Sequence, residues 1–276
     1  MLNIGWFSTG RGEGSRGLLR FVQERIARGL LDARIEFVFS NRDHGEAEGS
    51  DQFFGLANGY GLPLVTLSSV KFRRARGRPF AVLREEFDRQ VMDLLSRFHP
   101  DVCVLAGYML IASGAMCRSY PLLNLHPALP DGPIGTWQEV IWQLIQSRAE
   151  RTGAMVHLAT EDVDRGPVLS YCMVPITGRS FTPHWDELGP QDLVQVQAEQ
   201  GEEFPLFQLI RQAQYQREPY LLFETLRAVA AGQVILKDGR VFDRERKPLS
   251  LTAPTGLCLD SEIEGAMDRD GLRPIL

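Results

Sequence analysis

The sequence predicts an α/β fold, built on a mainly parallel twisted sheet with helices on both faces. Through the first two thirds of the chain, short apolar runs alternate with segments of helical periodicity, and this alternation is typical of βαβ units. The runs are rich in Val, Ile and Leu, as expected of strands that are buried on both faces. With 276 residues and a hydrophobic content of 44%, the chain is long enough to enclose a substantial core.

Seven apolar runs are expected to be strands. They lie at 2–7, 35–39, 63–67, 101–106, 121–125, 154–159 and 168–174. The clearest helix is expected over 80–98, where apolar side chains recur at helical spacing. The members of this stripe are Leu83, Phe87, Val91, Leu95 and Phe98. A surface helix buries one face in this way, so the stripe is assigned to the core.

The C-terminal third is predicted to be a small helical and hairpin extension. Glycines and prolines predict a loop over 177–190. Helices are expected near 191–214 and 219–231, with Gly232 as a C-cap. Asp238-Gly239 is typical of the turn of a small hairpin.

The domain division follows from the same patterns. We expect one domain over 1–250 and an irregular tail over 251–276. The basic run Lys71–Arg78 is interpreted as an exposed loop before the next helix, because isolated charge runs are usually solvated.

Composition excludes several classes of protein. The net charge of −5 argues against a nucleic-acid partner, and no apolar run reaches the roughly 18 residues of a membrane span. The N-terminus lacks the features of a signal peptide. The four cysteines are far apart and show no C-x-x-C spacing, so we expect reduced thiols, a cytoplasmic location and no metal site.

The segment Asn124-Leu125-His126-Pro127 is the first candidate for chemistry. In a strand, residues two apart share a face, so Asn124 and His126 are expected to project together near the strand end, where Pro127 stops the ladder. Asp164 lies in a second loop, Val163–Pro167. An imidazole can move protons, an amide N–H can stabilise an oxyanion, and a carboxylate can support the imidazole. The alternative interpretation is a pair that only caps a loop.

Several motifs in matching order resemble the folate-dependent formyltransferases. They are Phe37–Arg42, Val104–Met109, Leu122–Leu129 and Gly153–Val168. The resemblance covers roughly residues 1–250 and implies a Rossmann-like fold. It is strongest to those members that formylate glycinamide ribonucleotide in purine synthesis.

The resemblance assigns roles to individual residues. The catalytic residues that it implies are Asn124, His126 and Asp164. It places the co-substrate, 10-formyltetrahydrofolate, between two segments, represented here by Leu105, Tyr108, Met109, Ile111, Thr160, Glu161, Asp162 and Val163. Without the resemblance, plain packing is the simpler interpretation of Tyr108 and Met109, and His157 reads as a satisfied core histidine.

A glycine-rich loop follows the first strand. Ser15 is a candidate N-cap for a helix that starts near Arg16, and backbone N–H groups at a helix N-terminus can hold an anion. The resemblance implies that the acceptor's phosphate lies here, on Gly12, Glu13, Gly14, Ser15 and Arg16. An ordinary glycine-rich turn is the alternative.

Departures from the family pattern leave the acceptor open. Glu13 brings a negative charge to the loop, and Leu110 stands where the family usually has Arg. The acidic residue that holds the acceptor's ribose in the family has three candidates here, namely Glu199, Gln200 and Glu202.

Taken together, these patterns predict a folate-dependent enzyme that formylates a small phosphorylated amine, glycinamide ribonucleotide first. A sugar-nucleotide amine is the alternative acceptor, and a non-catalytic folate- or nucleotide-binding protein on the same scaffold is the alternative class. The expected partners are small-molecule substrates, with no nucleic acid or membrane, and the chain is expected to be a monomer or a homodimer.

Overall fold

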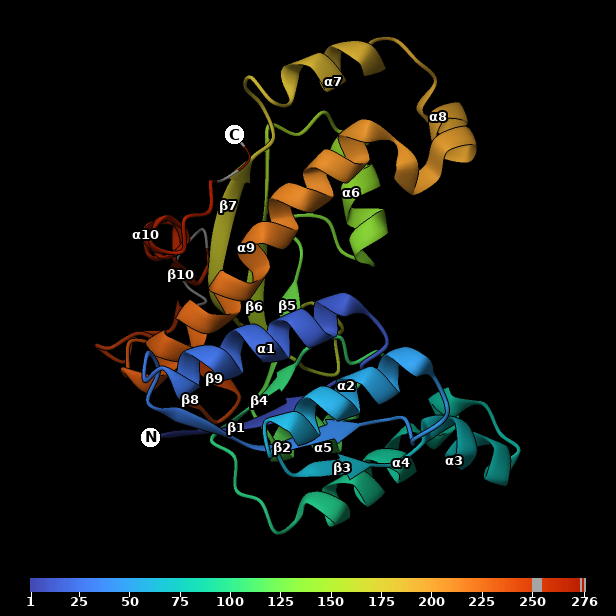
Figure 1. The fold of residues 1–276 in the computed structure, drawn as a ribbon, viewed down its shortest axis with the longest axis vertical. Helices are drawn as coiled ribbons and strands as arrows, with labels where there is room; N and C mark the ends of the chain where they lie inside the picture. Colours follow the sequence, from blue (N-terminus) through green and yellow to red (C-terminus); the bar gives the residue numbers. More distant parts are fainter. Residues whose placement is uncertain (250–254, 274, 276) are drawn as a thin grey trace. The chain divides into compact units, whose positions relative to one another are not determined.

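The computed structural model describes residues 1–249, 255–273 and 275, and the chain forms two compact units (Figure 1). Unit 1 comprises Met1–Asn124, His157–Pro167 and Leu226–Arg246. Unit 2 comprises Leu125–Val156, Val168–Thr225 and Lys247–Leu276. Each unit is described by itself below.

Unit 1 is a parallel sheet flanked by helices. Its strands are β1 (Leu2–Phe7), β2 (Ala33–Ser40), β3 (Leu64–Thr66), β4 (Val102–Leu105) and the first part of β5 (Leu122–His126), in the order β5-β4-β1-β2-β3. All four neighbouring pairs are parallel. The carboxyl ends of these strands therefore share one edge, where open α/β sheets bind their ligands.

The helices of unit 1 follow the strands in the predicted alternation. They are α1 (Glu13–Ala27), α2 (Glu48–Gly59), α3 (Ser69–Arg76), α4 (Phe80–Leu95) and α5 (Gly114–Ser119). The C-terminal end of α9, from Leu226 onward, also belongs to unit 1. The basic run expected to be a loop is mostly the helix α3. Ser68 caps it by accepting from Lys71 N, and Gly77 ends it at a φ of 60°.

The predicted α4 stripe belongs to the core of unit 1. Four of its five residues, Leu83, Phe87, Val91 and Leu95, are buried within the helix. The fifth, Phe98, lies beyond the helix and packs its ring 5.0 Å from that of Phe37. This cluster covers one face of the sheet, so the sheet is held by aromatic and aliphatic burial.

Unit 2 contains the remaining strands. These are most of β6 (Arg151–Leu158), β7 (Val168–Pro175) and β10 (Leu257–Cys258). The backbone bonds from Leu158 N to Pro167 O and from Ile176 N to Glu150 O follow opposite chain order, so β6 and β7 run antiparallel. By contrast, β10 pairs with β7 in parallel.

The helices of unit 2 enclose a second core. They are α6 (Trp137–Gln146), α7 (Thr182–Leu188), α8 (Leu193–Gln200), a 3₁₀ turn (Gly201–Glu203), most of α9 (Pro205–Ala230) and α10 (Asp260–Arg269). Phe181, Phe204, Phe207 and Ile210 are among the residues that are fully buried between them. No helix in the described part of the chain is long and apolar enough to cross a membrane.

The seven predicted strands and the hairpin are confirmed. The hairpin pairs β8 (Ile235–Lys237) with β9 (Arg240–Phe242). Both turn residues, Asp238 and Gly239, have positive φ, as a two-residue turn of this kind requires.

Three expectations in the C-terminal third are wrong. The segment 177–190 contains the helix α7. The helices expected near 191–214 and 219–231 are instead a short α8 and one long α9 that continues through Pro219. The tail expected to be irregular forms β10 and α10 in its described part, and α10 is held by the bond from Tyr220 Oη to Asp270 Oδ2 at 2.8 Å.

Candidate active site

Three of the polar side chains near the predicted motif meet within unit 1. Asn124 Nδ2 lies 3.3 Å from Asp164 Oδ1 and 3.1 Å from His157 Nε2. His157 Nε2 is itself 3.6 Å from Asp164 Oδ1. The predicted pairing of Asn124 with Asp164 is therefore present, and it includes a histidine that the sequence interpretation left in the core.

The hydrogen bonds of His157 define its tautomer. Its Nδ1 lies 3.0 Å from Leu158 O, and a carbonyl oxygen only accepts, so Nδ1 carries the proton in the neutral ring. Nε2 then presents a lone pair and accepts from Asn124. One N–H of the Asn124 amide is directed to His157 and the other to Asp164, which fixes the amide's orientation.

The register of the strands explains why His157 lies here. Ala159 N bonds to Leu122 O, and two residues further along β5 Asn124 meets His157. The residue numbers rise on one strand as they fall on the other, so these ends of β5 and β6 run antiparallel. His157 is only 1% exposed, so its interpretation as a core residue is correct. Its contact with Asn124 could have been predicted only from this cross-strand pairing, which requires the order of the strands to be known.

The loop after β6 positions Asp164 by its backbone. Asp164 has a φ of 56°, a left-handed conformation that Asp tolerates better than most residues. A Cβ on Gly166 would overlap Leu158 O, so glycine lets the loop fold back onto the end of β6. The Asp164 side chain retains 14% exposure, which leaves the carboxylate within reach of a ligand.

His126 lies in unit 2, at the end of β5. It is buried, and its Nε2 is 3.4 Å from Pro133 O, a carbonyl in the loop that follows the strand. That carbonyl can accept a hydrogen bond from Nε2 when this nitrogen carries a proton, and the bond then orients the ring. The convergence of His126 with Asn124 and Asp164 stays a prediction.

The glycine-rich loop differs from its prediction in where the helix begins. α1 begins at Glu13 with Gly12 as its N-cap, so the expected cap Ser15 is a buried residue of the first turn. No side chain caps this end of the helix. Its first-turn N–H groups thus keep their capacity to bind an anion, and the phosphate site stays a prediction.

The negative charge of Glu13 is balanced locally. Its carboxylate forms an ion pair with Arg16 at 2.8 Å and a second with Arg20 at 3.6 Å. Arg16 also donates to Gly49 O of α2 at 3.2 Å. The charge of Glu13 is therefore offset by neighbouring arginines, and Arg16 is largely committed to these contacts.

A pocket of about 600 Å³ lies in unit 1, between α5 and the loop after β6. Three of the predicted co-substrate residues, Thr160, Glu161 and Asp162, line it. The opposite wall comes from α5 with its C-cap and from the β8–β9 hairpin, including Gly114, Cys117, Tyr120 and Leu236. The pocket is large enough for a flat heterocycle with apolar walls.

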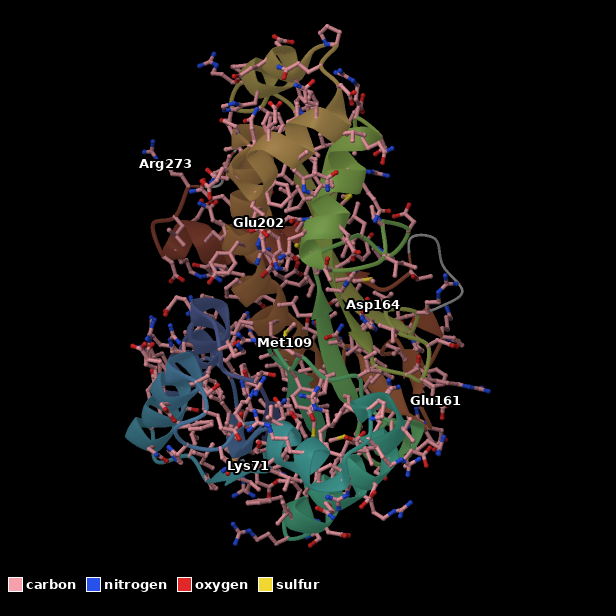
Figure 2. All side chains as sticks on the ribbon, turned by 90° about the vertical axis from the view of Figure 1, so that its right-hand side faces the viewer. Lys71, Met109, Glu161, Asp164, Glu202 and Arg273 are labelled. Carbon is pink, nitrogen blue, oxygen red and sulfur yellow. The ribbon has the colours of Figure 1, made fainter. Side chains whose placement is uncertain are left out.

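Glu161 lies across the α5 side of this pocket. Its Oε1 is 2.7 Å from Arg118 Nη1, and a Cβ on Gly114 would overlap the same carboxylate. Glu161 and Asp164, labelled in Figure 2, come from the same loop.

Burial raises the pKa of the Cys117 thiol to about 11, so this lining residue stays protonated at neutral pH.

The other predicted co-substrate residues do not line this pocket. Leu105 is buried, and the Tyr108 ring packs edge-on against Phe7 with centroids 5.7 Å apart. The contact of Tyr108 with the co-substrate stays a prediction. The remaining three, Met109, Ile111 and Val163, are exposed, with Met109 at 74%, so they can contact a ligand from solvent.

The three candidates for the acceptor's ribose lie on α8 and the 3₁₀ turn of unit 2. Glu199, Gln200 and Glu202 are all exposed. Glu202 accepts from Gln138 Nε2 at 3.3 Å, and Glu199 accepts from Gln195 Nε2 at 2.8 Å. Among residues 1–249, 255–273 and 275, no group of three or more His, Cys, Asp or Glu side chains could hold a metal ion.

Comparison with known proteins gives this arrangement a context. Residues 20–182 match the family model described as formyl transferase. The chain is 31% identical over 150 residues to phosphoribosylglycinamide formyltransferase of Escherichia coli, covering 53% of this chain and 68% of that protein. It is 36% identical over 96 residues to the Saccharomyces cerevisiae enzyme of the same name, covering 32% of this chain and 45% of that protein.

Solved structures agree on the fold. The phosphoribosylglycinamide formyltransferase of Coxiella burnetii matches with a TM-score of 0.64 at 22% identity, over 93% of this chain and 98% of that one. This likeness supports the predicted Rossmann-like architecture. Because the family model spans more than half of the residues, the chain belongs to the formyl transferase family.

Proposed function

We propose that this protein transfers a formyl group from 10-formyltetrahydrofolate to the primary amine of a small phosphorylated acceptor, with glycinamide ribonucleotide as the first candidate. The observation that carries the proposal is the pairing of Asn124 with Asp164 in a chain of this family. The relatives named above are phosphoribosylglycinamide formyltransferases, which supports this acceptor. The partners are then small molecules, in keeping with a cytoplasmic enzyme.

The proposed chemistry is acyl transfer through a tetrahedral intermediate. The acceptor nitrogen attacks the formyl carbon, and the formyl oxygen gains negative charge. An N–H of Asn124 stabilises that oxyanion, a kind of donor whose removal typically costs about 3 kcal/mol in the transition state. Both N–H groups of Asn124 are directed to other side chains, so one of these bonds is exchanged for the oxyanion.

Proton transfer completes the reaction. In the proposed mechanism His126 accepts the proton that the attacking amine loses, and it returns a proton to N10 of the folate as the carbon–nitrogen bond breaks. The products are the formylated amine and tetrahydrofolate. Asp164 favours the charged form of the imidazole, which assists the first of these transfers.

We propose that the pocket between α5 and the loop after β6 receives the flat ring system of the folate. Its lining combines apolar side chains with the polar loop Thr160–Asp162, which suits a ring with a polar edge. The exposed side chains of Met109 and Ile111 then offer apolar contact to the rest of the co-substrate. The first-turn N–H groups of α1 are proposed to hold the acceptor's phosphate.

An acceptor panel tests the proposal. The protein is mixed with 10-formyltetrahydrofolate and, in turn, glycinamide ribonucleotide, an amino-sugar nucleotide or no acceptor, and tetrahydrofolate formation is followed. We expect release that depends on glycinamide ribonucleotide. Release only with the amino-sugar nucleotide would replace the acceptor, release without any acceptor would indicate a hydrolase, and binding of folate without release would indicate a binding protein.

A further inference from the structure

Thr9 occupies a junction between the two predicted ligand segments of unit 1. It follows β1 and is 1% exposed. Its Oγ1 accepts from Met109 N at 2.9 Å and donates to Asn41 Oδ1 at 2.8 Å. Its backbone is bonded as well, because Thr9 N donates to Gly107 O at 3.0 Å and Thr9 O accepts from Ser50 Oγ at 2.9 Å.

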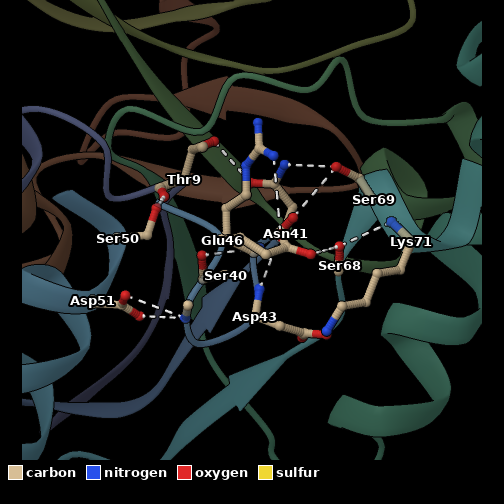
Figure 3. Close-up of polar contacts among 12 residues, drawn as sticks. Thr9, Ser40, Asn41, Asp43, Glu46, Ser50, Asp51, Ser68, Ser69 and Lys71 are labelled. Carbon is tan, nitrogen blue, oxygen red and sulfur yellow. Dashed lines mark hydrogen bonds and ion pairs between the residues drawn. The ribbon is translucent and has the colours of Figure 1, made fainter. Parts of the chain in front are cut away.

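The direction of the bond between Thr9 and Asn41 follows from the contacts of Asn41 with Ser69, which Figure 3 draws. Ser69 Oγ donates its one hydrogen to Asn41 O at 3.3 Å, so it accepts from Asn41 Nδ2 at 3.1 Å. The Oδ1 of Asn41 therefore faces Thr9 and takes the hydroxyl hydrogen. The lone pairs of Thr9 Oγ1 are left for the N–H of Met109.

The network joins two pieces of chain that the proposed function assigns to different substrates. Thr9 begins the loop that leads to the first turn of α1, where the acceptor's phosphate is proposed to bind. Met109 belongs to the exposed segment after β4 that is proposed to contact the folate. One hydroxyl group thus holds both segments at once, and it does so in a buried place where a lost bond is costly.

A packing contact joins the same two segments independently. Gly107 has a φ of 68°, and a Cβ added to it would overlap Ser15 Oγ of α1. The absence of a side chain at Gly107 lets the first turn of α1 lie directly against the segment that leads to Met109. The first turn of α1 and the segment that leads to Met109 are therefore joined by close packing as well as by hydrogen bonding.

We infer that Thr9 is a positioning residue that couples acceptor binding to folate binding, so that each ligand raises the affinity for the other. The inference rests on the proposed function. Coupling of this kind is reciprocal and typically amounts to about 5-fold or more in affinity. Thr9 makes no contact with reacting atoms in this account. Thr9 fixes the position of Met109 N when the acceptor occupies the loop after β1.

Paired substitutions at position 9 test the inference. Thr9→Val has nearly the same shape without the hydroxyl, and Thr9→Ser keeps the hydroxyl. The dissociation constant of folic acid, as an unreactive probe, is measured by calorimetry with and without saturating glycinamide ribonucleotide. Thr182→Val removes an exposed threonine hydroxyl from unit 2. It is the control for the general effect of losing one threonine hydroxyl.

The expected results are specific. The wild type, Thr9→Ser and Thr182→Val bind folic acid about 5-fold or more tightly with the acceptor present, and Thr9→Val shows a ratio near 1. A wild-type ratio of 1, or a Thr9→Val ratio equal to that of the wild type, overturns the coupling. If the wild type binds neither ligand, the proposed function itself fails, which is a distinguishable outcome.

A second measurement avoids any folding defect of Thr9→Val. Hydrogen exchange of the Met109 amide is followed in the wild type, with and without glycinamide ribonucleotide. The coupling predicts slower exchange of this amide when the acceptor is bound, although the acceptor is proposed to bind at α1. An exchange rate that is unaffected by a saturating acceptor overturns the inference.

Discussion

At the scale of single residues, the Asn124 amide is the best-defined part of the candidate site. Its two N–H groups are oriented by a tautomer of His157 and by the carboxylate of Asp164. These two bonds hold the amide plane in place, and one of them is exchanged for the oxyanion when charge develops. His157 is thus a positioning residue in this account, and Asn124 and Asp164 are the groups proposed to meet the substrate.

Replacing His126 tests the proposed proton transfer. His126→Ala removes the imidazole, and general acid–base catalysis typically contributes about 100-fold or more, so kcat for formyl transfer is expected to fall by that factor. The control is His99→Ala, an exposed histidine of unit 1. Turnover of His126→Ala equal to that of the control would remove His126 from the mechanism.

Asp88 gives a prediction about pH. It is 1% exposed and accepts from Ser113 N at 2.6 Å, where α5 begins. Burial raises the pKa of this carboxyl, while the hydrogen bonds from Ser113 and the nearby Arg84 oppose the shift and Glu85 adds to it. A carboxyl with a raised folded pKa costs no stability below its unfolded pKa, and its cost grows as pH rises through the folded value.

The comparison of Asp88→Asn with the wild type isolates this effect. The unfolding free energy of the variant minus that of the wild type is expected to increase as pH rises from about 4 toward 7, because only the wild type carries the titrating group. Urea unfolding at several pH values measures it. A difference that stays constant over this range would show that folding does not shift the pKa of Asp88, and a difference that decreases would show that folding stabilises its charged form; either result contradicts the prediction.

At the scale of elements, α6 has the most complete N-terminus. Thr136 accepts from Glu139 N, and Glu139 accepts in return from Thr136 N at 2.7 Å, which forms a capping box. These bonds from Thr136 lower the pKa of Glu139. Its contribution to stability is therefore present above the unfolded pKa and is lost as pH falls through the folded one.

Removing this cap is expected to cost stability. Thr136→Ala lowers the free energy of unfolding by about 1 kcal/mol, as is typical for a lost N-cap, whereas Thr136→Ser retains the hydroxyl and serves as the matched variant. Denaturant unfolding of both proteins provides the comparison. Equal stabilities would mean that the capping box does not support α6.

The first turn of α1 carries the prediction about the acceptor. Gly14 is the second residue of the helix, and a bulky side chain there would crowd an anion bound to the N–H groups. Gly14→Val is expected to raise the KM for the acceptor while folate affinity, measured without acceptor, stays nearly unchanged. Weakened folate binding with an unaltered acceptor KM would show that this turn is not the acceptor's site.

The success of prediction differed between kinds of element. Strands and the α4 stripe follow from apolar patterning, which burial in the core enforces. Pro219 suggested a boundary because proline lacks the N–H of the helical bond, yet α9 continues through it. The start of α1 was predicted too late in the chain. Gly12 and Ser15 are both acceptable N-caps, and only packing selects between them.

The candidate site was predictable in part. Motif order indicated Asn124 and Asp164, whose pairing needs only that β5 meets the loop after β6. The role of His157 depends on strand register, and the contacts of Thr9 depend on three separate chain segments. Such long-range arrangements are set by the tertiary fold, so local patterns in one sequence do not carry them.

At the scale of the whole molecule, the family defines the class of chemistry, formyl transfer, and the arrangement of the site residues is the basis for the proposed mechanism. Asp164→Asn keeps the size of the side chain, and Asn tolerates the left-handed backbone at this position, so the fold is expected to survive. The change removes the charge that is proposed to favour the protonated imidazole.

The decisive measurement is the rate of tetrahydrofolate formation from 10-formyltetrahydrofolate with and without glycinamide ribonucleotide, for the wild type and for Asp164→Asn. We predict that formation by the wild type depends on the acceptor and that Asp164→Asn lowers kcat by about 100-fold or more. No acceptor-dependent formation by the wild type, or equal turnover by the two proteins, would contradict the account.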